Sequence, residues 1–337
     1  MKRAIKFLGL GLFLLAGGNA LGQQYVIKFA TVAPEGSAWM NVMHEYDAAV
    51  RKESGGKMGF KIYPGAVQGD EKGMLRKIRI GQLHSGAFTG VGIGEVAPRV
   101  RIVDSPFLFR NVKEVDDIYT KFDKEFQQAL DEGGYVLLGW AELGFVYVFT
   151  NSPIQKPEDL RGIKMWTWEG DPIAETAFAT LGINPIPLSI DNVLTSLQTG
   201  LIDAFYTTPY AAIALQWFTR VKYMVDVPLA DASGALLISK KYYETLPADL
   251  QEILIRNGRS HMARLIQLNR LENLKAIEEF KKRGITILKP MENEITQYID
   301  VGERSRKKLV GRMYSADLLQ RVENELADFR KNNKGSK

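Results

Sequence analysis

The feature that most constrains the fold of this chain is a regular alternation of strand-like and helix-like segments. Short runs rich in β-branched and aromatic residues alternate with longer runs whose apolar residues recur at helical spacing. In the first part of the chain we expect strands and helices, in order, at 25–31, 37–53, 60–63, 71–80, 85–89, 112–131 and 135–140. Strands joined by helical crossovers lie parallel, so the pattern predicts an α/β fold with a mainly parallel sheet flanked by helices.

The alternation continues through the rest of the chain. Further strands and helices are expected at 146–150, 163–167, 173–181, 184–188, 190–199, 224–229, 236–239 and 285–288. Residues 249–283 favour one long helix, straight or kinked at Gly258. Two helices, 292–313 and 316–331, follow it.

The length of 337 residues is enough for two lobes that each bury a core. No Pro-rich or Ser-rich linker separates them, so we expect strands and the long helix to cross between the lobes and form a hinge. Lobe I is expected at 23–142 plus about 233–270, and lobe II at 143–232 plus about 271–315. Residues 316–337 are expected to form a C-terminal helix and a disordered tail.

The first 22 residues have the composition of a secretory signal peptide. Lys2, Arg3 and Lys6 precede an apolar run at 7–16, and small residues lie near Gly22. The run is too short to span a bilayer, so we expect cleavage after residue 22 rather than a membrane anchor. The chain contains no cysteine, which excludes disulfides and thiolate metal ligands. These features predict an exported protein of the bacterial periplasm without stable membrane insertion.

The sequence shows no motif for catalysis or for nucleic-acid binding. The net charge is only +5, and no basic stripe with interleaved aromatic residues occurs. His44, His84 and His261 lack ligand-spaced partners, and no Gly-x-Ser-x-Gly elbow is present. Residues 90–94 (GVGIG) depart from the dinucleotide-binding spacing, so we expect a tight turn there. We therefore predict no enzyme activity, no catalytic residues, no metal site, no cofactor and no nucleic-acid partner.

Residues 151–210 carry the side chains best suited to a ligand site. Asp171 is placed to cap a helix that begins at Pro172, directly after the strand expected at 163–167. A later strand, beginning near residue 201, ends in polar and aromatic residues. Open α/β sheets bind ligands in the crevice at their strand ends, so we expect the ligand here.

Four segments resemble, in the same order along the chain, the DctP-type extracytoplasmic solute receptors of TRAP transporters. They are residues 63–71 (YPGAVQGDE), 151–154 (NSPI), 157–165 (PEDLRGIKM) and 197–203 (LQTGLID). The resemblance implies a two-lobed periplasmic-binding-protein-like fold, with a long helix along both lobes and one small organic solute in the cleft. It also implies delivery of that solute to the small and large membrane subunits of a TRAP transporter.

The resemblance does not extend to the residue that binds the ligand in this family. Members of this family place an arginine after the Gly-x-Lys-x run, where it grips a carboxylate, but this chain has Trp166 there. A second arginine, expected before the Asn-Ser-Pro turn, is also missing from 143–150. The ligand is therefore expected to differ from an arginine-clamped dicarboxylate, and to be apolar or aromatic, or to carry a cation that sits over an indole.

Trp166 is the leading candidate for a ligand contact because it occupies the position of the family arginine. Trp168 lies two residues along the same strand and should share its face. For Trp168, Phe205 and Trp217, a place in the core beneath the cleft is an equally weighted alternative. The full set of expected ligand-binding residues is Trp166, Glu169, Trp168, Thr89, Gly90, Phe145, Tyr147, Tyr206, Thr207, Thr208, Tyr210 and Trp39.

Two other functions are compatible with the same residues. A periplasmic ligand sensor for a signalling partner would need the same closed form. A secreted enzyme on the same two-lobed scaffold is the third reading, because a fold does not determine a function.

Overall fold

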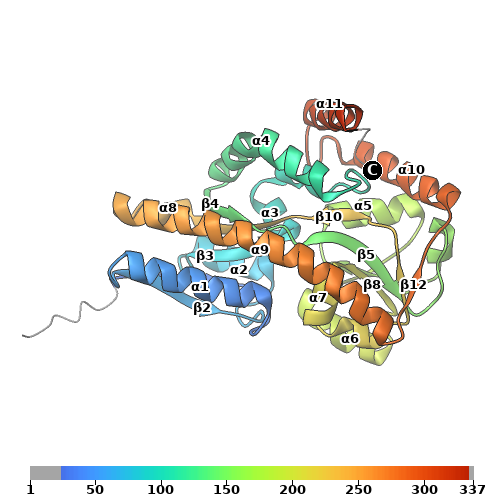
Figure 1. Ribbon diagram of the computed structural model, residues 1–337, viewed down its shortest axis with the longest axis horizontal. Helices are drawn as coiled ribbons and strands as arrows, with labels where there is room; N and C mark the ends of the chain where they lie inside the picture. Colours follow the sequence, from blue (N-terminus) through green and yellow to red (C-terminus); the bar gives the residue numbers. More distant parts are fainter. Residues whose placement is uncertain (1–23, 334–337) are drawn as a thin grey trace, which may run out of the picture.

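Two five-stranded sheets organise the computed structural model, which describes residues 24–333 (Figure 1). The first sheet has the order β2-β1-β3-β11-β4. Strands β1, β2 and β3 are parallel, and β11 runs antiparallel to both β3 and β4. Their bounds are β1 Tyr25–Ala30, β2 Met58–Tyr63, β3 Ser85–Thr89, β4 Tyr135–Trp140 and β11 Gly234–Ser239.

The second sheet is built around β5, which pairs antiparallel with β8, β9 and β10. Strand β12 extends it parallel to β9, and a bridge between Met165 and Ala204 joins it to the parallel pair β6 and β7. The bounds are β5 Gly144–Thr150, β6 Trp166–Trp168, β7 Ile186–Leu188, β8 Ala204–Thr207, β9 Tyr223–Val225, β10 Ala230–Ala232 and β12 Thr286–Leu288. Each sheet thus has one strand that runs against the others.

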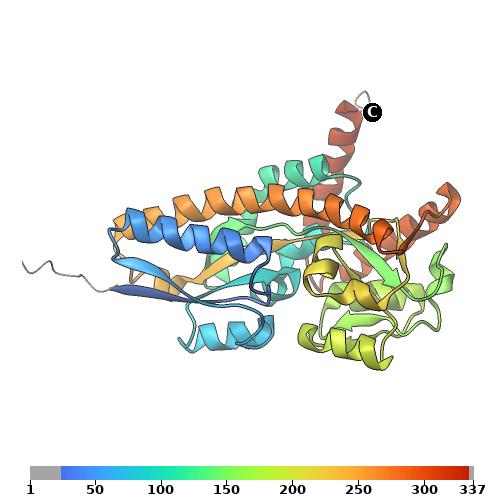
Figure 2. The ribbon, with the colours of Figure 1, turned by 60° about the horizontal axis from the view of Figure 1, so that its bottom comes forward.

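Helices cover both faces of the first sheet because both faces carry apolar side chains. On one face, Ile27 and Phe29 of β1 pack against α1 (Ala38–Glu53) and α9 (Ala248–Lys282), which lie side by side (Figure 2). The other face packs against α2 (Glu71–Arg79), α3 (Gly90–Val96) and α4 (Val112–Glu132), and α11 (Ala316–Asn332) lies on α4. We call this sheet with its helices lobe I.

The second sheet is covered in the same way, and with its helices forms lobe II. The covering helices are α5 Pro172–Leu181, α6 Val193–Thr199, α7 Pro209–Ala214 and α10 Glu292–Leu309. The remaining helical pieces are α8 Lys240–Tyr243 and 3-10 turns at Pro98–Asp104, Pro157–Leu160, Ile190–Asn192 and Trp217–Arg220. Within residues 24–333, no helix combines the length and the apolar character needed to cross a bilayer.

Four segments cross between the lobes, one of which is the connection 310–315 from α10 of lobe II to α11 of lobe I. Two others are extended stretches, 140–144 between β4 and β5 and 230–234 between β10 and β11, which we call the crossing strands. They are joined by hydrogen bonds from Ala141 N to Gly234 O (2.7 Å) and from Leu143 N to Ala232 O (2.9 Å). The fourth is α9, which runs along both lobes (Figure 1) and donates from Asn269 Nδ2 to Glu142 O (2.8 Å).

The predicted two-lobed α/β fold, with sheets flanked by helices and a long helix along both lobes, is confirmed; the sheets are mixed, because β11 and β5 pair antiparallel with their neighbours. The predicted cap at Asp171 is confirmed too, since its side chain accepts a hydrogen bond from Ile173 N; Ser37 and Asp70 cap α1 and α2 in the same way. The exact lobe boundaries stay a prediction. The expected signal peptide at 1–22 lies outside the described residues, as do residues 334–337 of the expected tail.

Several local expectations are corrected. Residues 90–94 form the start of α3 rather than a tight turn, because Glu71 binds the N–H groups at its beginning. Gly258 does not interrupt α9; it lets the helix approach β4, where a side chain would meet the carbonyl oxygen of Leu138. The strand expected at 163–167 begins only at Trp166, and the helix α7, for which no expectation was stated, follows β8 at residues 209–214.

Candidate functional site

A largely apolar cavity of about 270 Å³ lies between the two lobes. Lobe I lines it with the ends of β1 and β3, and lobe II with β5, β6, β8, β10 and the helices α5 and α7. It also reaches residues of α10, including Tyr298. Strand ends of both sheets therefore converge on one cavity, the place where α/β sheets bind ligands.

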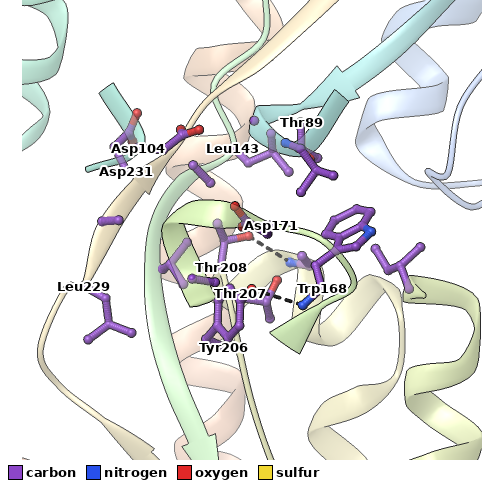
Figure 3. A pocket seen from close by; sticks show the side chains of 18 of the residues that line it. Thr89, Asp104, Leu143, Trp168, Asp171, Tyr206, Thr207, Thr208, Leu229 and Asp231 are labelled. Atoms are coloured by element: carbon purple, nitrogen blue, oxygen red, sulfur yellow. Dashed lines mark hydrogen bonds between the residues drawn. The ribbon is translucent and has the colours of Figure 1, made fainter. Parts of the chain in front are cut away.

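Most of the residues expected to bind a ligand lie in the wall of this cavity. They are Trp39, Thr89, Gly90, Trp166, Trp168, Tyr206, Thr207, Thr208 and Tyr210. Figure 3 shows Thr89 of lobe I opposite Trp168, Tyr206, Thr207 and Thr208 of lobe II. The structure thus brings together residues that are up to 171 positions apart in the chain, from Trp39 to Tyr210.

Three expected residues lie elsewhere, and the expectation that they line the cavity is corrected. Successive side chains of a strand point to opposite faces, and β5 presents Val146 and Val148 to the cavity. Phe145 and Tyr147 therefore lie on the other face of β5, where they pack against the cores of lobe I and lobe II. Glu169 follows β6 and is exposed to solvent.

Trp166 forms a wall of the cavity rather than a free hydrogen-bond donor. Its side chain is only 2% exposed, and its Nε1 donates to Leu188 O at 3.0 Å. The indole stacks on Tyr206 with the ring centres 5.1 Å apart, and meets Trp217 edge-on at 5.3 Å. Trp166 thus offers a ligand apolar surface in place of the positive charge that an arginine would supply.

Trp168 has a free donor. Its indole extends from the end of β6 toward Thr89 (Figure 3), and its Nε1 is buried without a hydrogen-bond partner. Phe205 by contrast is fully buried and stacks on Phe149, so it belongs to the core. A buried N–H group without a partner costs free energy, which makes Trp168 a candidate contact for a ligand acceptor.

A buried ion triad spans the two lobes at the cavity wall. Arg101, from the 3-10 turn before α4, donates from Nε to Asp104 Oδ2 (2.7 Å) and from Nη1 to Asp171 Oδ1 (2.6 Å). Burial alone would lower the pKa of Arg101, but the carboxylates of Asp171 and Asp104 raise it above its ordinary value. The Arg101–Asp104 spacing of three residues was the one sequence signal for this triad; its link to Asp171 is purely tertiary.

Glu71 is a second buried acid in the wall. Its carboxylate accepts from Thr89 N (2.8 Å), Gly92 N (2.7 Å) and Thr89 Oγ1 (3.1 Å). Burial raises the pKa of Glu71 to about 7, although these hydrogen bonds have the opposite effect and lower it. A side chain on Gly92 would meet this carboxylate, so the approach requires glycine. Glu71 belongs to the segment 63–71 that resembles the family, but its sequence context does not predict a place in the site.

Further polar groups of the wall have no hydrogen-bond partner. Both carboxylate oxygens of Asp231, Asn269 Oδ1 and Tyr298 Oη are buried and unpaired. Burial, and then the neighbouring Glu142 and Asp104, raise the pKa of Asp231 well above its usual range. Nothing local in the sequence marks any of these three residues as part of the site. Among residues 24–333, no cluster of three or more acidic or histidine side chains could hold a metal ion.

The lobes touch across the cavity, so the structure is a closed form. Besides the Arg101–Asp171 pair, Ala38 N of lobe I donates to Tyr210 Oη of lobe II at 2.8 Å. Lys72 Nζ, also of lobe I, donates to Gly170 O at 3.2 Å. Val91 of α3 packs in the same apolar cluster as Trp166 and Trp168.

Comparison with known proteins identifies a family. The family model described as bacterial extracellular solute-binding protein, family 7, matches residues 29–311. The 2,3-diketo-L-gulonate-binding periplasmic protein YiaO of Escherichia coli is 24% identical over 74% of this chain and 76% of that protein. The C4-dicarboxylate-binding periplasmic protein DctP of Rhodobacter capsulatus is 23% identical over 79% of this chain and 80% of that protein.

Solved structures share the fold. The sugar acid binding protein DctPAm of Advenella mimigardefordensis, in complex with galactonate, superimposes with a TM-score of 0.85. It is 20% identical in sequence, and the match covers 91% of this chain and 99% of that one.

Proposed function

The chain belongs to family 7 of the bacterial extracellular solute-binding proteins, and we propose that it captures one small organic solute and delivers it to a membrane permease. Members of this family are extracytoplasmic receptors of TRAP-type transporters. The observation that carries the proposal for this chain is the largely apolar cavity between two lobes that four segments join. No chemical step is part of the function.

Capture proceeds by closure of the lobes around the solute. Binding stabilises the closed form only by as much as the solute binds that form more tightly than the open one. The contacts that span the cavity, Arg101 with Asp171 and Ala38 with Tyr210, form only when the lobes are closed. The permease subunits then distinguish a loaded receptor from an empty one by its shape.

The signal peptide and the permease partners are further parts of the proposal. Export through cleavage after residue 22 would place the receptor in the periplasm, where a TRAP-type permease can meet it. The support is the charged and apolar pattern of residues 2–16 together with the extracytoplasmic character of the family. Sequencing the N-terminus of the protein isolated from periplasm tests this; an intact residue 1 would refute it.

The central test is to identify what the native protein carries. The protein is purified from its own host without added solute, denatured, and the released small molecules are identified by mass spectrometry. We expect one organic solute at close to one molecule per chain, and the same solute should rebind unchanged. Conversion of the solute during incubation would indicate an enzyme, and the absence of any bound or rebinding solute would refute the receptor function.

A further inference from the structure

The charged residues that line the cavity leave no free positive charge. Among the described residues of the wall these are Glu71, Arg101, Asp104, Asp171 and Asp231, each at least nine-tenths buried. Arg101 is the one cation of this set, and two carboxylates already bind it. The triad itself carries a net negative charge.

A solute carboxylate would therefore be poorly accommodated. It would have to displace Asp104 or Asp171 from Arg101, or lie beside them without a counter-charge. Asp171 is held in place because it also caps α5, accepting from Ile173 N at 3.1 Å. Burying an ion without a partner costs several kcal/mol, so the cavity discriminates against anionic solutes.

The other two acids do not form a cation site. The Glu71 carboxylate is already occupied by three donors from Thr89 and Gly92. Burial favours the neutral form of both Glu71 and Asp231, as their raised pKa values indicate. A neutral acid attracts a cation far less than a carboxylate does, so the wall offers little to an ammonium group.

The rest of the wall is apolar and extends beneath the second sheet. Val146 and Val148 of β5, Ala174 and Phe178 of α5 and Tyr298 of α10 enclose this part. The total volume of about 270 Å³ exceeds the roughly 150 Å³ of an engineered apolar cavity that holds one benzene molecule. The space thus suits a hydrocarbon body larger than a single ring.

Among the unpaired polar groups of the wall, which include Asp231 and Asn269, two on lobe II mark where such a body would carry its polar atoms. Trp168 Nε1 is a donor without an acceptor, and Tyr298 Oη is likewise buried and unpaired. We propose that the solute of this receptor is an uncharged, mainly hydrocarbon molecule with a hydroxyl or carbonyl group that accepts a hydrogen bond from Trp168. The inference rests on the proposed receptor function and names its solute class.

The test uses matched probes that differ in charge alone: octanol, octanoate and octylammonium, with D-glucuronate and galactonate as sugar acids. Binding is followed by intrinsic fluorescence, because Trp39, Trp166, Trp168 and Trp217 line the cavity and only the fifth tryptophan, Trp140, does not. At about pH 6, where octanoate is ionised and Glu71 still keeps its proton, we expect octanol to bind at least about tenfold more tightly than octanoate or octylammonium. Neither sugar acid should bind.

A variant of Asp171 tests whether the charge of the cavity wall, rather than its shape, excludes octanoate. Asp171→Asn keeps a good helix cap but removes one carboxylate from Arg101, so the octanoate affinity should rise relative to that of octanol by roughly tenfold. Glu175→Gln is the matched control: Glu175 also lies in the first turn of α5, but it is exposed, pairs with Arg312 and does not line the cavity. That variant should leave the ratio unchanged. Circular dichroism and melting curves establish that both variants fold.

Each result has a defined meaning. Octanoate binding as tightly as octanol, octylammonium binding most tightly, or no change of the ratio in Asp171→Asn would overturn the inference. Tight binding of a sugar acid would overturn it too, while leaving the receptor function intact. Failure of every probe to bind the folded protein would also overturn it, and the analysis of the natively bound solute then decides separately whether the receptor function stands.

Discussion

At the scale of single residues, two tryptophans of the same strand face have different roles. The indole N–H of Trp166 is already bonded to Leu188 O, whereas that of Trp168 has no partner. Trp166 therefore shapes the cavity, and Trp168 is the residue able to recognise a polar atom of the solute. The sequence pointed to Trp166 because of its position in the family segment, but only the structure separates the two.

Replacing Trp168 by Phe should weaken binding of the native solute by about 1 kcal/mol, roughly fivefold in affinity, because one hydrogen bond is lost while most of the ring remains. Titration calorimetry measures the change. Trp140→Phe is the matched control, since Trp140 Nε1 donates to Asp123 Oδ1 outside the cavity. It should lower stability without altering affinity. Equal affinity of Trp168→Phe and the wild type would contradict the assigned contact.

Glu71 should make stability depend on pH. Burial raises its pKa from 4.5 to about 7, so between these values the folded protein keeps a proton that the unfolded chain has lost. Glu71 therefore contributes fully to the free energy of unfolding below about pH 4.5. This contribution, on the order of 3 kcal/mol, is lost as the pH rises to about 7.

Denaturant unfolding of the wild type and of Glu71→Gln across this range measures the effect. The variant cannot titrate at this position, so the stability difference between the two proteins should change in favour of the variant as the pH rises. Other buried acids such as Asp231 act on both proteins and cancel in the difference. A difference that stays constant from about pH 4.5 to 7 would show that Glu71 ionises normally.

At the scale of elements, the crossing strands depend on a close approach at Gly234. A side chain there would overlap the carbonyl oxygen of Ala141 on the neighbouring strand. Gly234→Ala should therefore lower the free energy of unfolding by about 3 kcal/mol, as overpacking in a tight site does. Gly182→Ala is the comparison: it also adds a methyl group to a glycine, but into open space at φ 72°, for a cost of about 1 kcal/mol. Similar losses for both would argue against the clash.

Elements with a strong local signal were the ones the sequence could predict. Strand β3 and strand β4 have the predicted bounds, and α9 lies within one residue of its prediction at each end. The errors fall where tertiary contacts decide. Residues 90–94 become helical because Glu71, from another element, accepts hydrogen bonds from the N–H groups of Thr89 and Gly92. Gly258 stays inside α9 because the helix needs a small residue against β4.

The site was harder to predict than the elements. Residues near the ends of β3, β6 and β8 were placed correctly in the wall, since parallel strand ends converge. Phe145 and Tyr147 were assigned to the wrong face of β5. Alternate residues of a strand point to opposite faces, so an error of one residue exchanges the two faces for every side chain. Arg101 and Asp231 were missed, since Arg101 meets Asp171, 70 residues further along the chain, and nothing local predicts the burial of Asp231.

At the scale of the whole molecule, closure depends on contacts that join the two lobes. Tyr210 Oη accepts from Ala38 N, and Tyr210 N in turn donates to Asn273 of α9. Tyr210→Phe removes the contact between lobes, so the solute-free protein should open and its radius of gyration in X-ray scattering should increase. Tyr242→Phe is the control, because that hydroxyl donates to Val26 O within lobe I. An unchanged radius in Tyr210→Phe would mean that other contacts suffice for closure.

The unbroken helix α9 has a consequence for how occupancy is communicated. It is fastened to the crossing strands by Asn269, which donates to Glu142 O, and by Asn273, which donates to Leu143 O. Because α9 is anchored at this point, the lobes rotate about an axis near it. Such a rotation displaces each atom in proportion to its distance from that axis. A small adjustment around a captured molecule therefore becomes the greatest movement at the outer rims, where a docking protein can detect it without reaching the interior.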